Sequence, residues 1–150
     1  MSEDLAAWAQ SRQQPKPAGL VPDDGRMTPI ELKVVREALG LSREQLAAAL
    51  NVGVRSVDDW KSGRRPIPDG VREDVERIEA YTAEVADHLA AHLLEHAGPA
   101  PVFEVYDRDA DMPALDLPGA PLPLTARWWR AVAYQVAEDV PGLQIVEAPK

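Results

Sequence analysis

Five cationic side chains fall close together in this sequence, between positions 43 and 65, and they indicate an anion-binding surface. They are Arg43, Arg55, Lys61, Arg64 and Arg65. A guanidinium group is permanently charged and presents a rigid fork of donors, which can hold a phosphate or a guanine edge at two points. The chain as a whole has a formal net charge of −9 at pH 7. A basic cluster in such an acidic chain favours contact with a polyanion such as DNA.

The acidic residues are concentrated outside this stretch. Residues 28–68 hold seven Lys or Arg and five acids, whereas residues 69–150 hold six basic and sixteen acidic residues. Salt screens repulsion beyond about 8–10 Å, so a locally basic face can still bind DNA. We expect modest affinity for a single copy and therefore a need for two DNA-binding heads.

Catalytic and metal chemistry have little support in the sequence, and we predict neither an enzyme nor a cofactor. The chain has no cysteine, which excludes disulfides and cysteine–zinc sites. His88, His92 and His96 recur at four-residue steps, but three histidines on a polar stripe more often face solvent, so no metal site is predicted. The apolar runs are too short to span a bilayer and no signal sequence is visible, so we expect a cytoplasmic protein without a membrane partner.

The elements that position the cations are three short helices within residues 28–68. Thr28-Pro29-Ile30-Glu31 and Ser42-Arg43-Glu44-Gln45 are capping boxes that begin the first two helices. Gly53 can begin a third helix, which carries Val57 and Trp60 into the core. The expected left-handed turn residues are Gly40, Asn51 and Gly63. A tight turn between the second and third helices makes this a helix-turn-helix.

The same stretch resembles the lambda-repressor-like, or XRE-type, helix-turn-helix family. The motifs that carry the resemblance are LSREQLA from Leu41, LNVG from Leu50 and SVDDWKSGRRP from Ser56. The chain departs from the family pattern at Asn51, where Gly is usual, and at Gly53, where a Ser or Thr cap is usual. Asp58 and Asp59 replace neutral or basic residues on the outward side of the recognition helix.

The resemblance implies which residues contact DNA. A recognition helix enters the major groove with its N-terminal residues facing the bases. Arg55 is the strongest candidate base reader, and its alternative role is an exposed cation paired with Asp58 or Asp59. The predicted base contacts are Val54, Arg55, Ser56 and Asp59, and the predicted phosphate contacts are Arg43, Gln45, Lys61, Ser62, Arg64 and Arg65.

The remaining chain is divided by glycine and proline. We predict a flexible N-terminal tail at 1–27, a helix-turn-helix domain at 28–80, a linking helix at 81–100 and a C-terminal α/β dimerisation domain at 101–150. The last part reads as a strand near 102–106, a long loop, a helix capped by Thr125 and a closing strand near 143–146. The predicted fold class is mainly α with a small α+β C-terminal part.

A β-loop-α-β unit of this size has too few strands to be stable alone, so we predict a homodimer. The predicted interface residues are Phe103, Tyr106, Trp128, Trp129 and Val132. The order of elements also resembles the small phage and bacterial regulators that accompany anti-CRISPR genes, which repress their own operons as dimers. That resemblance also implies that RNA could be bound.

The sequence therefore predicts a homodimeric transcriptional repressor that binds a palindromic operator in double-stranded DNA and controls its own operon, in a phage or mobile element. Two alternatives remain open. One is an antitoxin whose acidic second half wraps a basic toxin. The other is a protein-interaction module in which Asp58 and Asp59 have abolished DNA binding.

Overall fold

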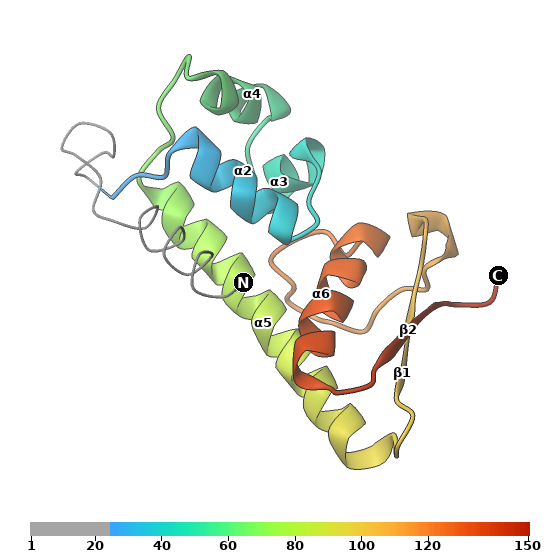
Figure 1. The fold of residues 1–150 in the computed structure, drawn as a ribbon. Helices are drawn as coiled ribbons and strands as arrows, with labels where there is room; N and C mark the ends of the chain where they lie inside the picture. The colour runs from blue at the N-terminus through green and yellow to red at the C-terminus, as the bar shows by residue number, and fades with distance from the viewer. Residues whose placement is uncertain (1–24) are drawn as a thin grey trace, which may run out of the picture.

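The computed structural model describes residues 25–150, which form a mainly helical fold with a small parallel sheet (Figure 1). The expected tail at 1–27 lies outside the described residues except for its last three. Residues 25–150 contain five α-helices, one 3-10 turn and two strands, which confirms the predicted fold class. The elements are α2 (Pro29–Ala38), α3 (Arg43–Leu50), α4 (Val54–Ser62), α5 (Gly70–His96), β1 (Val102–Val105), η1 (Asp109–Asp111), α6 (Ala126–Asp139) and β2 (Gln144–Glu147).

Both capping boxes form as predicted. The Thr28 hydroxyl accepts a hydrogen bond from the Glu31 amide at 3.2 Å, and the Glu31 carboxylate accepts one from the Thr28 amide at 3.1 Å. Ser42 and Gln45 make the same reciprocal pair at the start of α3. These bonds satisfy amide groups that a helix N-terminus leaves unpaired, so they fix where α2 and α3 begin.

The turn between α3 and α4 also follows the sequence prediction. Asn51 ends α3 in the left-handed conformation with φ 56°, and Gly53 precedes the first residue of α4. Gly63 ends α4 with φ 78°. Short polar or glycine residues tolerate this conformation, which turns the chain sharply at both places. Trp60 is 4% exposed, which confirms its predicted place in the core.

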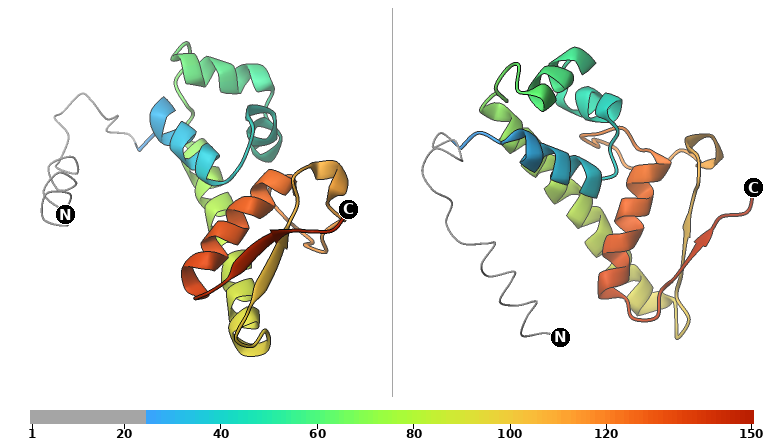
Figure 2. Two further views of the ribbon diagram at one scale, coloured as in Figure 1. Left: turned by 45° about the vertical axis from the view of Figure 1, so that its right-hand side comes forward. Right: turned by 45° about the horizontal axis from the view of Figure 1, so that its top comes forward.

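The long helix α5 joins the two halves of the fold. It runs unbroken for 27 residues through the expected boundary near residue 80. The helices α2, α3 and α4 gather at its N-terminal end, and α6 packs along its C-terminal half with the sheet on the far side of α6 (Figures 1 and 2). A single set of buried apolar residues extends from Leu32 in α2 to Val136 in α6. No helix in residues 25–150 is both long and apolar enough to cross a membrane.

One buried hydrogen bond links α5 to α6. Trp128 and Thr82 are both 0% exposed, and the indole Nε1 of Trp128 donates to Thr82 Oγ1 at 3.0 Å. The Thr82 hydroxyl donates in turn to the Ile78 carbonyl at 2.9 Å. Both polar groups therefore have a hydrogen-bond partner. Among the described residues, Thr82 is the only partner of the indole N–H.

Close contact between the halves also depends on Gly40. It follows α2 with φ 67°, and a Cβ at this position would lie 2.5 Å from the Arg127 carbonyl oxygen. Only glycine allows this approach without displacing the first turn of α6. The end of α2 therefore packs directly against the start of α6.

The sheet is completed by a crossover through α6. β1 and β2 are parallel, with Phe103 opposite Ile145. Phe103 lies against Trp129, with ring centroids 5.1 Å apart, and Trp129 Nε1 donates to the Glu104 carbonyl at 3.0 Å. The layers in Figure 2 run from α5 through α6 to the sheet. The outer strand β2 is exposed along its whole length.

Thr82→Val should destabilise the fold by about 1–3 kcal/mol, because it keeps the shape of the side chain and leaves the buried indole N–H of Trp128 without an acceptor. Urea unfolding followed by circular dichroism measures the change. Thr82→Ser is the control, because it retains the hydroxyl and should cost less than Thr82→Val. Equal losses in the two variants would contradict a stabilising role for the hydrogen bond.

Candidate nucleic-acid interface

Arg55 lies exposed near the start of α4, the expected recognition helix. It makes no ion pair or hydrogen bond with any residue of the described chain, so its guanidinium is available to a ligand. The alternative role considered from the sequence, a pair with Asp58 or Asp59, is not observed. Val54 precedes it and is half-buried against the core.

Asp58 and Asp59 form ion pairs with different arginines. Asp58 pairs with Arg43 of α3, with Arg43 Nη1 and Asp58 Oδ1 3.0 Å apart. Asp59 pairs with two arginines of the loop after α4: its carboxylate lies 3.3 Å from Arg65 Nε and 3.7 Å from Arg64 Nη1. Only 14% of the Asp59 side chain is exposed. The structure therefore aims Asp59 at the basic loop, and its expected contact with a base would require these pairs to break.

Further hydrogen bonds fold the basic loop onto α4. Arg65 Nη2 donates to Ser56 Oγ at 3.2 Å, and the Arg65 amide donates to the Asp59 carbonyl at 3.2 Å. The Ser62 hydroxyl donates to the same carbonyl at 3.2 Å and accepts from the Arg64 amide at 3.4 Å. Two predicted contacts, Ser56 and Ser62, thus have local roles in shaping this loop, while Arg64 and Arg65 keep more than half of their side chains exposed.

The other predicted phosphate contacts come from the start of α3 and from the end of α4. Arg43 is exposed between Glu44 and Asp58. Its hydrogen bond to Glu44 and the charge of Asp58 raise the pKa of Arg43 above its ordinary value, so it stays charged. The Gln45 side chain is held by the capping box and is half-buried. Lys61 is exposed on α4 and has no ion pair within residues 25–150.

Ion pairs bring the start of α3 and the loop at 63–66 against α4, because Arg43 meets Asp58 and the two loop arginines meet Asp59. Residues 32–71 match a family model described as helix-turn-helix. The match extends from α2 to the first turn of α5 and supports a lambda-repressor-like domain of a DNA-binding transcription regulator. No curated protein matches the chain.

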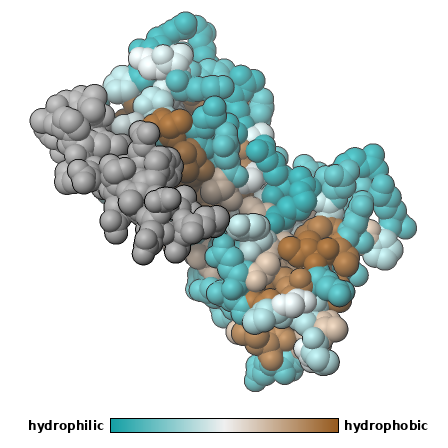
Figure 3. Space-filling view, in the orientation of Figure 1, coloured by the Kyte–Doolittle hydropathy of each residue, from teal (hydrophilic) through white to brown (hydrophobic). Residues whose placement is uncertain are grey.

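The five predicted interface residues separate into two groups. Phe103, Trp128 and Val132 are 6%, 0% and 0% exposed, so the core of a single chain accounts for them without a second copy. Tyr106 and Trp129 are half-buried. The exposed apolar residues of the sheet, Val102, Ile145 and Val146, were not among the predicted interface residues. Figure 3 shows hydrophobic surface over this sheet. The alternation of apolar residues along each short strand could have indicated these residues. Alternation alone does not show which face of the sheet a helix covers.

The histidine stripe on α5 is exposed. The rings of His92 and His96 lie 4.7 Å apart between centroids. No group of three or more potential metal-binding side chains occurs within the described residues.

Asp59→Asn should tighten binding to random-sequence DNA by about twofold to fivefold at low salt, because it removes a negative charge and frees Arg64 and Arg65. Fluorescence anisotropy at two salt concentrations measures the effect. The melting temperature should change little, because both arginine partners are more than half exposed and the amide keeps the shape of the side chain and one oxygen acceptor. Glu37→Gln is the control, because it removes one exposed acid from α2. An equal gain from both variants would mean that net charge alone is responsible.

Proposed function

We propose that this protein is a homodimeric transcriptional repressor that binds a palindromic operator through α4 and controls its own operon. The observation that carries the proposal is the exposed Arg55 at the start of α4, which pairs with no residue of 25–150, on the same helix as Asp59, which holds the arginines of the following loop. A free guanidinium near the start of a recognition helix suits guanine O6 and N7 in the major groove.

The surrounding cations suit the DNA backbone. Arg43 begins α3, Lys61 lies near the end of α4, and Arg64 and Arg65 follow it, so cations lie on both sides of Arg55. Contacts to phosphate fix the register of a protein on DNA but do not read sequence. We therefore assign base reading to Arg55 with Val54, and backbone contacts to the other cations. Ser56 and Asp59 support the loop.

A homodimer is supported by the C-terminal sheet. Parallel sheets are usually covered on both faces, and a two-stranded sheet is marginally stable alone. Here the sheet has only two strands, and Val102, Ile145 and Val146 are 46%, 46% and 37% exposed. Ile145 shares a face with Phe103, whereas Val102 and Val146 lie on the other face. Pairing of two such sheets along β2 would cover Ile145 and Val146 at this edge and bring two recognition helices onto half-sites about one helical turn apart. Repression would follow from exclusion of polymerase, as in the anti-CRISPR-associated regulators that the sequence resembles.

Arg55→Ala should weaken binding to the operator by about 1–3 kcal/mol and leave random DNA almost unaffected, because Arg55 would touch bases only. The measurement is a titration of the full chain with its own upstream DNA and with a scrambled duplex, at two salt concentrations. Wild-type protein should bind the upstream duplex more tightly and in a salt-dependent manner.

Arg64→Ala is the matched contrast. It should weaken binding to both duplexes alike, since a phosphate contact carries no sequence information. It should also lower the slope of log affinity against log salt concentration by about one. An equal loss on both duplexes for Arg55→Ala would contradict base reading. Failure of the wild type to bind either duplex would instead favour an antitoxin, a protein partner or RNA.

Ile145→Lys should shift the protein from dimer to monomer, because it places a charge at the exposed edge of the sheet. Light scattering coupled to size-exclusion chromatography measures the molar mass. Val34→Lys serves as the control, since Val34 is 59% exposed on α2, away from the sheet. A monomeric wild type, or a dimer that survives Ile145→Lys, would contradict this interface.

A further inference from the structure

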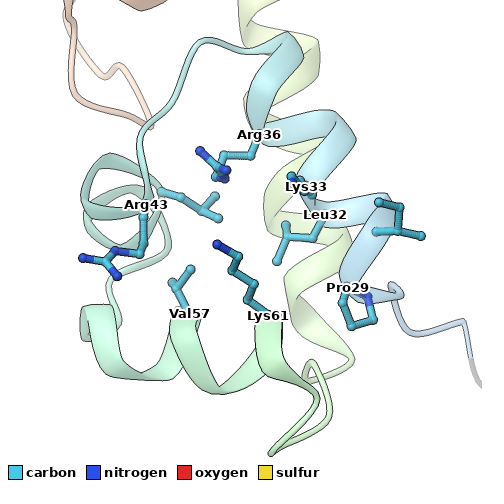
Figure 4. A pocket seen from close by; sticks show the side chains of 9 residues that line it. Pro29, Leu32, Lys33, Arg36, Arg43, Val57 and Lys61 are labelled. Atoms are coloured by element: carbon cyan, nitrogen blue, oxygen red, sulfur yellow. The ribbon is translucent and has the colours of Figure 1, made fainter.

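A groove lies between α2, α3 and α4, and it shares Arg43 and Lys61 with the DNA contacts proposed above (Figure 4). Its volume is about 270 Å³. Residues of all three helices line it: Pro29, Ile30, Leu32, Lys33, Arg36, Arg43, Leu46, Val57 and Lys61.

The lining combines an apolar floor with a cationic rim. Leu32, Leu46 and Val57 are 5%, 2% and 5% exposed and form the floor. Four cations belong to its lining, two from α2 and one each from α3 and α4. In Figure 4, Lys33, Arg36 and Lys61 lie around the opening, whereas the guanidinium of Arg43 points away from it. No acidic residue of 25–150 belongs to the lining. This composition is unusual in a chain with a net charge of −9.

The two lysines of the rim lack counter-ions within the structure. Lys33 and Lys61 make no ion pair or hydrogen bond with any residue in 25–150. Arg36 is fixed at the edge by a bond from its Nη1 to the Leu41 carbonyl at 2.9 Å. Arg43 is the one rim cation that is neutralised, by Asp58 and Glu44. The opening is therefore positively charged above a hydrocarbon surface.

We propose that this groove binds a small amphipathic organic anion, with its carboxylate between Lys33 and Lys61 and its apolar part on Leu32, Leu46 and Val57. An inorganic anion would satisfy the rim but leave the floor exposed to water, whereas a neutral apolar molecule would leave the lysines unpaired. The volume is slightly below the range of about 300–1,000 Å³ for typical ligand pockets, which favours a compact ligand.

Such a ligand would act on DNA binding. Lys61 and Arg43 line the groove and are also proposed phosphate contacts, so a bound carboxylate would compete with DNA for their charge. Because the coupling between two binding sites is reciprocal, DNA would weaken binding of the ligand by the same factor. This regulatory consequence rests on the proposed function, but ligand binding itself does not.

The test is a titration of the ¹⁵N-labelled full chain, without DNA, followed by two-dimensional NMR. The probes are 3-phenylpropionate, its neutral amide 3-phenylpropanamide, and inorganic phosphate. We expect saturable shifts at the amides of Lys33, Val57 and Lys61 with the carboxylate, at least fivefold weaker binding of the amide, and no saturable shifts with phosphate. Equal binding of the carboxylate and the amide, or shifts centred on the sheet at Ile145, would overturn the proposal.

Two substitutions on α2 test whether the ligand binds in this groove. Ile30 lines the groove and is 62% exposed, so Ile30→Glu adds an acid at the rim and should weaken 3-phenylpropionate by about fivefold or more. Val34 lies one turn further along α2, is 59% exposed and does not line this groove, so Val34→Glu should leave binding unchanged. Unchanged binding in Ile30→Glu would overturn the assignment. Because no DNA is present, this outcome is independent of whether the protein binds an operator.

Discussion

The buried indole N–H of Trp128 imposes the constraint on which the arrangement of the two halves depends. A donor that is fully removed from water must find an acceptor inside the protein, and Thr82 of α5 supplies it. Because a hydrogen bond is directional, it fixes both the rotation and the position of α6 along α5, which apolar contact alone would leave looser. Gly40 and the first turn of α6 then meet closely enough that no side chain fits between them. The helix-turn-helix and the sheet are consequently parts of one packed body.

The charged side chains of α3, α4 and the loop at 63–66 are paired selectively. The acids at 58 and 59 looked unfavourable for DNA binding when only their position on the recognition helix was known. In the structure, they bind Arg43, Arg64 and Arg65, and they leave Arg55 alone. A carboxylate that holds a cation in place reduces the freedom that the cation would lose on meeting a phosphate, and it keeps non-specific attraction low. Both effects favour discrimination between sequences over raw affinity.

Local signals in the sequence determined most of the helix-turn-helix. Thr28, Ser42, Asn51 and Gly63 act on neighbouring backbone groups, so their types and spacing were sufficient to predict where helices begin and end. Contacts between distant residues could not be predicted in the same way. Nothing in the sequence pairs Thr82 with Trp128, or Asp59 with a particular arginine, because these pairings depend on how helices pack. For the same reason, Phe103, Trp128 and Val132 were expected at an interface between copies, yet the chain's own core accommodates them. The groove beside α2 was missed because its rim is assembled from three helices.

The continuity of α5 has a geometric consequence. An α-helix advances about 1.5 Å and turns about 100° with each residue, so these 27 residues act as a ruler roughly 40 Å long. Adding or removing one residue in its middle, where Ile78, Thr82 and Ala86 are buried, would rotate the helix-turn-helix about the helix axis relative to α6 and break the hydrogen bond between Thr82 and Trp128. Changes of a whole number of turns would preserve the facing and alter only the reach. The packing between the two halves therefore constrains the length of α5 as well as its sequence.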